Sequence, residues 1–467
     1  MNRKFDVVIV GAGPAGMSAA IKLRTFDLSV LVVDEQPEPG GKLWHRVESI
    51  AGTSLAHVLG KEYESGESVA SLFRGSGATY EPNTQVWQID PSLRVLLRRD
   101  GEVESVKAKE IIVATGALER PAPFPGWTLP GVMPVGGAQL LLKDSRQIPQ
   151  GPTWVAGSGP LLILYMAQVI KVGGEIEGWL DTSAPGEWLR TLRWFKSVFK
   201  GRKDVLKGLL WLNQIKRSGT KRIRGVKSFH AYGEGRLHEL EYTLANGLTK
   251  RVRANALLVH EGVVPSIHMT QSLGLKHHWS HQQSCLVPSL DSWGASSLAG
   301  ISVAGDGAGI GGGQAACVRG EIVALGIAMR IGLLEQKSAD ALVSPLRKKL
   351  KNLLSIRPML DALYPPPQRL IFPSDETVVC RCEEITVGDI RRVASMASPG
   401  INQLKAFTRA GMGPCQGRQC GYTIANIIAT EQKRQVNEND FYRIRPPLKP
   451  ITLGELVSLK IDEELDS

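Results

Sequence analysis

A glycine-rich turn between two apolar segments near the N-terminus is the feature that most restricts the fold. Residues 5–10 are apolar and lead into Gly11-Ala12-Gly13-Pro14-Ala15-Gly16, and a second apolar segment, 28–33, ends at Asp34 and Glu35. In a strand–turn–helix unit, the first glycine permits the turn, the second lets a pyrophosphate approach the backbone, and the third lets helix and strand pack closely. An acid after the next strand can bind ribose hydroxyls. The sequence therefore predicts an α/β dinucleotide-binding domain.

Two later segments extend this pattern. A predicted strand over 110–116 ends in Ala114-Thr115-Gly116, and another over 300–304 ends in Gly305-Asp306 before a glycine run that opens the helix 314–330. An acid at such a strand end can bind cofactor hydroxyls, and the N–H groups of the helix can bind an anion. For Asp306 alone, a helix cap and a cofactor ligand remain equally good interpretations.

A second glycine turn, Gly157-Ser158-Gly159-Pro160, follows the short apolar segment 153–156. Its third glycine position holds Leu162, whose side chain is expected to push the helix away from the strand. NAD(P) is therefore not a firm expectation. A Rossmann-like domain without nucleotide and a working nicotinamide site both remain open.

Charge and hydropathy narrow the function classes. The net charge is +11, but the segment 186–225 holds twelve basic and two acidic residues, so the rest is nearly neutral and does not indicate nucleic-acid binding. That segment is either an amphipathic insertion with a solvated face or a peripheral contact with anionic lipid or an acidic partner. No stretch matches a membrane span or a signal peptide, so we expect a cytoplasmic location, including the inner membrane face.

All six cysteines lie after residue 284, which excludes a disulfide framework and the redox cysteine pair of flavin disulfide reductases. Four of them form C-x-C and C-x4-C pairs: Cys380, Cys382, Cys415 and Cys420. Four thiolates suit tetrahedral zinc or a [2Fe–2S] cluster. C-x-C is an awkward zinc pattern, so we favour the cluster, with the first pair on one iron and the second pair on the other. Glycines around the second pair allow backbone N–H groups to face the sulfurs.

Together these motifs resemble the α subunits of heteromeric flavin-dependent amine and imino-acid dehydrogenases: opine oxidase, hydrogen cyanide synthase, D-hydroxyproline and dye-linked proline dehydrogenases and, more distantly, sarcosine oxidase. The resemblance covers nearly the whole chain. It rests on residues 10–16, 38–41, 114–120, 125–127, 130–132, 305–307 and 411–420. The last motif resembles the [2Fe–2S] domain of bacterioferritin-associated ferredoxin, although that small protein has C-x2-C where this chain has C-x4-C.

The resemblance and the Pro-rich break at 364–367 divide the chain into two Rossmann-like domains of the glutathione-reductase type and a small helical [2Fe–2S] domain. We expect an FAD-type domain over 1–126 and 260–330, an inserted domain over 127–259, a linker over 331–372, the cluster domain over 373–435 and an extended tail over 436–467. The predicted cofactor contacts are Gly11, Gly13, Ala15, Gly16, Asp34, Glu35, Gly41, Lys42, Ala114, Thr115, Gly116, Gly305 and Asp306.

The resemblance also implies a division of labour. Amine oxidation would occur on FAD in a β subunit similar to D-amino-acid oxidase and sarcosine oxidase, with FMN at the subunit interface and a small third subunit. This chain would bind FAD and pass electrons through its cluster to an acceptor such as quinone, and no catalytic residue is assigned to it. The alternatives are a self-sufficient NAD(P)H-dependent flavoprotein reductase and a non-catalytic scaffold.

Overall fold

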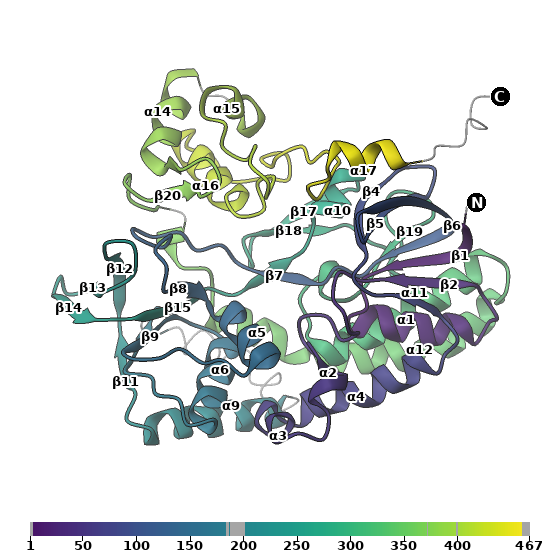
Figure 1. Ribbon diagram of the computed structural model, residues 1–467, viewed down its shortest axis with the longest axis horizontal. Coiled ribbons are helices and arrows are strands. Elements are labelled where there is room, and N and C mark those ends of the chain that lie inside the picture. Colours follow the sequence, from purple (N-terminus) through teal and green to yellow (C-terminus); the bar gives the residue numbers. More distant parts are fainter. Residues whose placement is uncertain (1–2, 184–185, 187–200, 371, 398–399, 460–467) are drawn as a thin grey trace.

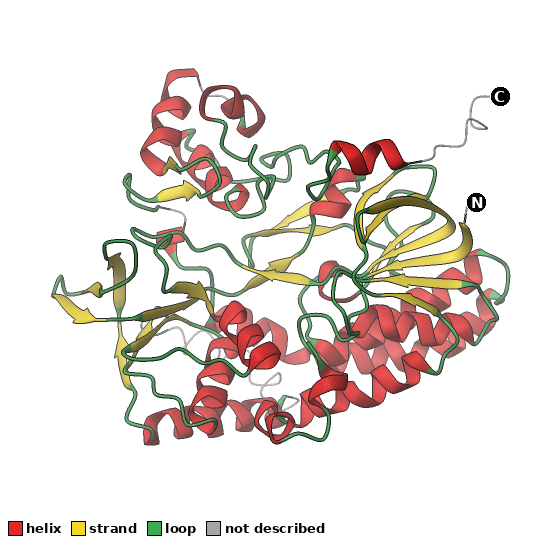
Figure 2. Ribbon diagram, viewed as in Figure 1, coloured by secondary structure: helices red, strands yellow, loops and turns green. Residues whose placement is uncertain are grey.

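The computed structural model describes residues 3–183, 186, 201–370, 372–397 and 400–459. Two sheets lie side by side, long helices cover one face of them, and the C-terminal helices α14 (Val387–Ala397), α15 (Ile401–Thr408) and α16 (Gly421–Glu431) form a separate group on the opposite side (Figures 1 and 2). None of the described helices combines the length and apolar character needed to cross a bilayer.

The first sheet has the strand order β3-β2-β1-β6-β5-β4, and β19 pairs with the end of β6. β1, β2, β3, β6 and β19 run parallel, so their C-terminal ends meet at one edge. The strands are β1 (Arg3–Val10), β2 (Val30–Val33), β3 (Thr79–Glu81), β4 (Gln85–Ile89), β5 (Arg94–Arg99), β6 (Glu102–Val113) and β19 (Ile301–Val303). The residues of β2 and the second half of β1 are all buried, which suits a sheet covered on both faces.

Helices α1 (Pro14–Arg24) and α11 (Gly313–Arg330) pack against each other under this sheet at very short range. A Cβ atom on Gly320 would lie 2.2 Å from the carbonyl oxygen of Ala15, so only a glycine permits this contact. The other helices on this side are α2 (Val47–Ile50), α3 (Ser54–Leu59), α4 (Lys61–Arg74) and α12 (Gln336–Leu353).

The second sheet is parallel and has the order β11-β10-β9-β15-β8. Its elements are β8 (Val132–Pro134), α5 (Val135–Ser145), β9 (Thr153–Gly157), α6 (Pro160–Lys171), β10 (Gly178–Asp181), α9 (Arg202–Arg217), β11 (Lys221–Arg224) and β15 (Ala256–His260). An antiparallel sheet of β12 (Val226–Tyr232), β13 (Glu239–Leu244) and β14 (Thr249–Arg253) is inserted before β15. The chain crosses between the two domains on β7 (Ala117–Glu119) and β16 (Val263–Pro265), which pair with each other.

After β16, the chain returns to the first domain. Its remaining elements are α10 (His268–Ser272), β17 (His277–Ser280), β18 (Cys285–Pro288), η2 (Gly305–Ala308), η3 (Leu354–Ile356), α13 (Arg357–Leu363), η4 (Gln368–Leu370), β20 (Val378–Cys380), β21 (Ile385–Thr386) and α17 (Leu453–Ser458). The segment 331–372, which the sequence suggests as a linker, contains α12, whose Ala339 and Val343 are fully buried. The segment 436–467 contains α17, and Leu448 N–H donates to Trp87 of β4 at 2.8 Å.

Candidate functional site

The glycine turn between β1 and α1 is packed so tightly that two of its glycines cannot be replaced. A Cβ atom on Gly11 would lie 2.5 Å from the carbonyl oxygen of Ala114, and one on Gly16 would lie 1.9 Å from the carbonyl oxygen of Gly11. Gly11 also has a φ of +110°, which favours glycine. Both glycines therefore serve the close packing of β1, α1 and the end of β6.

Gly13 differs, because nothing in the fold requires a glycine there. Its φ of −73° is open to any residue, and a Cβ atom would meet only the Cα of Gly41, 3.9 Å away. Gly13 is the N-cap of α1, whose first turn contains no acidic side chain and no side-chain cap. Free N–H groups at the positive end of a helix attract anions. The open space at Gly13 therefore fits a pyrophosphate group.

Two adjacent carboxylates after β2 are used differently. Asp34 turns back onto the glycine turn, where its two oxygens accept the N–H groups of Ala12 at 2.6 Å and Gln36 at 2.8 Å. Burial raises the pKa of Asp34 despite these bonds. Glu35 is exposed and forms an ion pair with Lys449 at 2.8 Å. Asp34 thus orders the turn, and Glu35 is the carboxylate with the freer side chain.

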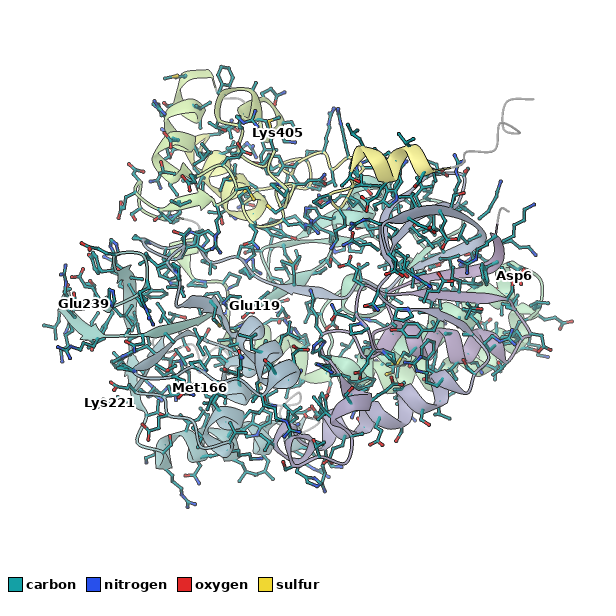
Figure 3. All side chains as sticks on the ribbon, in the orientation of Figure 1. Asp6, Glu119, Met166, Lys221, Glu239 and Lys405 are labelled. Atoms are coloured by element: carbon teal, nitrogen blue, oxygen red, sulfur yellow. The ribbon has the colours of Figure 1, made fainter. Side chains whose placement is uncertain are left out.

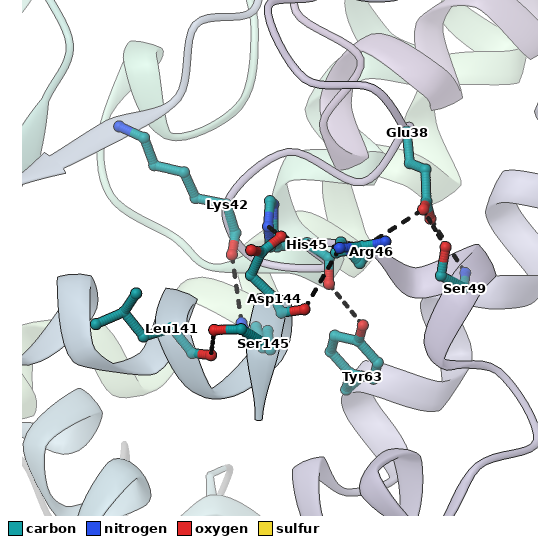
Figure 4. A network of polar contacts seen from close by, with 10 residues as sticks. Glu38, Lys42, His45, Arg46, Ser49, Tyr63, Leu141, Asp144 and Ser145 are labelled. Carbon is teal, nitrogen blue, oxygen red and sulfur yellow. Dashed lines mark hydrogen bonds and ion pairs between the residues drawn. The ribbon is translucent and has the colours of Figure 1, made fainter. Parts of the chain in front are cut away.

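The loop 40–46 forms another wall of this site and is held by a lysine from the second domain. Lys143 on α5 is buried and donates hydrogen bonds to the carbonyl oxygens of Leu43 at 2.8 Å and Lys42 at 3.3 Å. Arg46 of the same loop forms ion pairs with Glu38 and with Asp144 of α5 (Figure 4). Burial lowers the pKa of Lys143 to about 7. The Lys42 ammonium donates to the carbonyl oxygen of Ala117 at 3.1 Å. Sequence analysis missed Lys143, because a lysine whose acceptors are mainly backbone carbonyls leaves no motif.

Two further predicted segments lie at the same edge of the first sheet. A Cβ atom on Gly305 would lie 2.8 Å from the Cβ of Ala15, and one oxygen of Asp306 accepts the N–H groups of Gly311 at 2.8 Å and Gly312 at 3.0 Å. Asp306 therefore orders the glycine loop before α11. β6 ends at Val113, so residues 114–116 form the loop that follows it. The segments at this edge carry the predicted residues Gly11, Gly13, Ala15, Gly16, Asp34, Glu35, Gly41, Lys42, Ala114, Thr115, Gly116, Gly305 and Asp306.

The second glycine turn, between β9 and α6, has the same first-glycine conformation as the first turn but differs at the N-cap, where Gly159 has a positive φ and Gly13 does not. Gly157 and Gly159 have φ values of +125° and +116°, and a Cβ atom on Gly157 would lie 1.8 Å from the carbonyl oxygen of His260. Leu162 is completely buried in the apolar core. The turn is thus as tight as the first one, although no third glycine follows it.

Acidic side chains near this second turn are already paired. Asp181 at the end of β10 forms an ion pair with Arg222 at 2.7 Å. Glu119, at the crossing between the two sheets (Figure 3), lies 2.5 Å from Nδ1 of His260 at the end of β15. The groups that would recognise a ribose are therefore engaged by the chain itself.

Residues 364–369, distant in the sequence, supply the partner of another acidic side chain at this edge. Glu261, with 1% of its side chain exposed, forms an ion pair with Arg369 of η4, and the Arg369 guanidinium lies 4.4 Å from the Phe229 ring centre. Burial lowers the pKa of Arg369 to about 9. Burial and the nearby Asp181 carboxylate raise the pKa of Tyr364 to about 12. Residues 364–369 therefore lie against the carboxyl edge of the second sheet, a role that a Pro-rich break in the sequence does not indicate.

The structure brings the four C-terminal cysteines together in two pairs. Cys380 ends β20 and contacts Cys420, the N-cap of α16, whereas Cys382 contacts Cys415. Cys382 also interacts with Cys380, and Cys420 with Cys415, so the interactions run both across and within the sequence pairs C-x-C and C-x4-C that we expected to act together. Within the described part of the chain, no three or more His, Cys, Asp or Glu side chains are grouped closely enough to hold a metal ion.

Backbone N–H groups surround one of these sulfurs. Cys380 receives hydrogen bonds from the Cys420 side chain and from the backbone of Gly411, Glu383 and Cys382, and they lower its pKa to about 6. The bond to Cys380 and burial raise the pKa of Cys420. An ionised sulfur among N–H donors is the form in which cysteine binds zinc or an iron–sulfur cluster. Cysteine is thus the right ligand type for such a centre, but the described side chains do not form a group of three that could hold a metal.

The loop that carries Cys415 and Cys420 is tied to the first domain by the C-terminal segment. The Gln416 side chain donates to the carbonyl oxygen of Pro447 at 2.6 Å, and Arg418 donates to that of Leu448 at 3.4 Å. The next residue, Lys449, pairs with Glu35. The segment that holds the cysteine loop therefore continues directly into the residue that reaches the first glycine-turn site.

Comparison with known proteins agrees with this geometry. The chain is 37% identical to the A subunit of opine oxidase from Rhizobium meliloti (strain 1021), over 97% of this chain and 99% of the relative. The chain belongs to the family of opine oxidase A subunits. The HcnB subunit of hydrogen cyanide synthase from Pseudomonas aeruginosa is 33% identical over 97% of this chain and 98% of its own length. The alpha subunit of sarcosine oxidase from Rhizobium meliloti is 23% identical, and the match covers 42% of that longer protein.

Domain and structure comparisons support the same family. Residues 5–161 match the pyridine nucleotide-disulphide oxidoreductase family, and residues 374–458 match the sarcosine oxidase A3 domain. The fold is similar to L-proline dehydrogenase from P. horikoshii, with a TM-score of 0.70, 20% identity and coverage of 97% of this chain and 80% of that one. Thioredoxin reductase of T. acidophilum matches 71% of this chain and 99% of its own, with 17% identity and a TM-score of 0.52. The predicted flavoprotein oxidoreductase fold with two Rossmann-like domains and a helical C-terminal region is confirmed.

Proposed function

We propose that this chain is the flavin- and iron–sulfur-carrying subunit of a heteromeric enzyme that oxidises the CH–NH group of an amino acid, an imino acid such as D-hydroxyproline, or an opine. The observation that carries this proposal is that one short segment links the loop of Cys415 and Cys420 to the first glycine turn. Relatives that are subunits of opine oxidase and hydrogen cyanide synthase support it.

The first glycine turn is the proposed FAD site. The free N–H groups at the start of α1 would bind the pyrophosphate beside Gly13, and Glu35 would reach a ribose. Asp306 would fix the loop before α11, whose N-terminus faces the same edge. Bound there, FAD supplies reversible two-electron chemistry.

The four cysteines are the proposed ligands of a [2Fe–2S] centre, with Cys380 held as a thiolate by its N–H donors. Bound there, the centre exchanges single electrons, which would connect flavin chemistry to an acceptor such as quinone. The contribution of the protein is to keep the sulfurs ionised and to hold the loop against the first domain.

A partner chain would oxidise the substrate. We infer a β subunit with its own FAD, similar to D-amino-acid oxidase or sarcosine oxidase, FMN between the subunits, and a small third subunit. The support is that the relatives are themselves named as single subunits of opine oxidase, hydrogen cyanide synthase and sarcosine oxidase. Within this family, the amine specificity would then be decided mainly outside this chain.

Helix α9 lies in the basic segment 186–225, and it supports a peripheral membrane contact. Leu206, Leu209 and Leu210 are 59%, 57% and 61% exposed and share one helix face. Lys203 and Arg217 flank them on the exposed surface. Apolar residues between basic ones suit anionic lipid at the inner face of the cytoplasmic membrane. Residues 187–200 of the same segment lie outside the described part.

Two alternatives remain for comparison. A self-sufficient NAD(P)H-dependent reductase needs a nucleotide at the second turn, where Asp181 and Glu261 are already paired with arginines. A non-catalytic scaffold would hold nucleotide for structure alone. The open space at Gly13 and the link from the cysteine loop to Lys449 favour the electron-carrying subunit over both.

The decisive experiment is metal analysis with EPR of the dithionite-reduced chain, purified anaerobically with its partner. We expect two irons per chain and visible absorbance, both lost in Cys415→Ser, while substrate binding by the partner survives. Cys317→Ser is the matched control, since this half-buried thiol lies on α11. Stoichiometric zinc without iron would refute the cluster and indicate a structural site.

A second measurement separates the alternatives. NADH or NADPH added to the purified chain is expected to leave the flavin absorbance unchanged. Rapid bleaching would favour the stand-alone reductase, and absence of any redox-active flavin would favour the scaffold. Cofactor extraction after co-purification would report FAD, FMN and the partner together.

A further inference from the structure

Three buried polar side chains of the second domain form a continuous chain of hydrogen bonds that reaches the first domain at both ends. They are Lys143 and Gln139 on α5 and Gln168 on α6, which are 4%, 8% and 3% exposed. At one end, the Lys143 ammonium donates to two backbone carbonyl oxygens of the loop 40–46. At the other end, the Gln168 amide donates to the carbonyl oxygen of Leu59 at 3.3 Å. The two domains therefore meet through a buried polar path.

Each hydrogen bond in this chain has a fixed donor and a fixed acceptor. Nζ of Lys143 donates to Oε1 of Gln139 at 3.3 Å, and Nε2 of Gln139 donates to Oε1 of Gln168 at 2.9 Å. An ammonium can only donate and the Leu59 carbonyl can only accept. Turning over either amide would therefore place two donors face to face at one side and two oxygens face to face at the other. The chain has one direction, from Lys143 to Leu59.

Burial makes every link of this chain costly to break. A buried polar group that loses its partner is not rehydrated, so its desolvation is left uncompensated. Leu59 is the last residue of α3, and the carbonyl groups at a helix C-terminus have no partner inside the helix. A shift of α6 against α3, or of α5 against the loop 40–46, would leave such groups unpaired. The chain therefore resists movement of one domain against the other.

We propose that Lys143, Gln139 and Gln168 form an interdomain lock: they fix the second domain to the first, and through them the second domain sets the position of the loop 40–46. This loop is one wall of the first glycine-turn site, so the three side chains are positioning residues for that site. The lock requires neither a bound cofactor nor a metal, and it therefore stands or falls apart from the proposed function.

The test is Gln168→Leu in the full chain, followed by amide hydrogen exchange. This change removes the link to Leu59, at the end of the chain far from the loop 40–46. We expect the protection factors of the loop amides, such as that of Trp44, whose N–H is hydrogen-bonded within the loop, to fall about tenfold. Unchanged protection in the loop, with a loss confined to the residues next to Leu59, overturns the lock.

Gln168→Glu keeps the size of the side chain and tests the direction of the hydrogen bonds. A protonated carboxyl group can accept from Gln139 and donate to Leu59, whereas a carboxylate can only accept. We expect the protection of the loop 40–46 to equal that of the wild type at about pH 5 and to lie about tenfold below it at about pH 9. The same ratio to the wild type at both pH values would contradict a directional chain.

Gln214→Leu is the matched control for the loss of an amide. Gln214 on α9 donates to the carbonyl oxygen of Ala167 on α6 at 3.0 Å, so both ends of its hydrogen bond lie in the second domain. We expect exchange in the loop 40–46 to equal that of the wild type. An equal fall in protection in Gln214→Leu and Gln168→Leu would show a general loosening of α6 and overturn the lock.

Discussion

The two glycine turns of this protein begin with a similar glycine, Gly11 at a φ of +110° and Gly157 at +125°, but their N-cap glycines and their surroundings differ. At the first turn, a Cβ atom on Gly13 would meet only the Cα of Gly41, 3.9 Å away. At the second turn, the acidic groups around the sheet edge are paired with Arg222, His260 and Arg369. The difference teaches that a glycine turn makes a nucleotide site possible, whereas the neighbouring strand ends and the chain that covers them decide whether it stays open.

The largest effect on cofactor binding should follow from filling the open turn. Gly13→Val places two methyl groups where the pyrophosphate would lie, so we expect cofactor affinity to fall about 100-fold or more, which corresponds to about 2.8 kcal/mol. Flavin content after gel filtration measures this, with circular dichroism as the control for folding. Gly16→Ala should instead reduce stability, by about 1–3 kcal/mol, because its Cβ meets Gly11. Full flavin content in a folded Gly13→Val protein would contradict the site.

Breaking the buried ion pair at the second turn should lower the free energy of unfolding rather than the cofactor content. Arg369→Met leaves the buried Glu261 carboxylate without its guanidinium, so we expect the free energy of unfolding to fall by about 3–5 kcal/mol. Urea denaturation measures the loss. The double variant Arg369→Met/Glu261→Gln should recover much of it, since no buried charge remains unpaired. A single variant as stable as the wild type would show that segment 364–369 does not hold this edge.

Asp306 separates the contribution of charge from that of loop geometry at the first site. Asp306→Ala should weaken flavin retention by about 1.5–3 kcal/mol, because the acceptor that orders Gly311 and Gly312 is lost. Asp306→Asn keeps a side-chain oxygen and should retain the loop. Equal retention in the wild type and both variants, measured by flavin dilution, would reduce Asp306 to a helix cap.

The smallest effect is expected where the C-terminal segment reaches the first site. Glu35 and Lys449 have 44% and 26% of their side chains exposed, so Lys449→Ala should change stability by about 0–1 kcal/mol. Thermal unfolding at low salt and at about 1 M salt measures it, and the difference from the wild type should shrink in high salt. A large and salt-independent loss would mean that the segment is a main support of the site.

The sequence by itself determined the features that depend on a few neighbouring residues. Gly11 and Gly16 follow from local backbone geometry, and the carboxylates after β2 and the cysteine spacing lie within short stretches. These features recur at fixed sequence intervals, so the first Rossmann-like domain could be predicted, and the four cysteines could be singled out as candidate ligands. Their finer roles could not: Asp34 turns to the backbone, and Glu35 is left freer.

Only the tertiary structure decided what depends on residues far apart in the chain. Arg369 comes to Glu261, Lys143 to the loop 40–46, and the Tyr442 ring to Gly417. The cysteines likewise pair across their two sequence motifs. None of these contacts follows from a fixed sequence spacing. A buried polar group needs a partner of suitable chemistry, but that partner can come from any part of the chain. Which partner arrives is set by how the two sheets and the C-terminal helices pack.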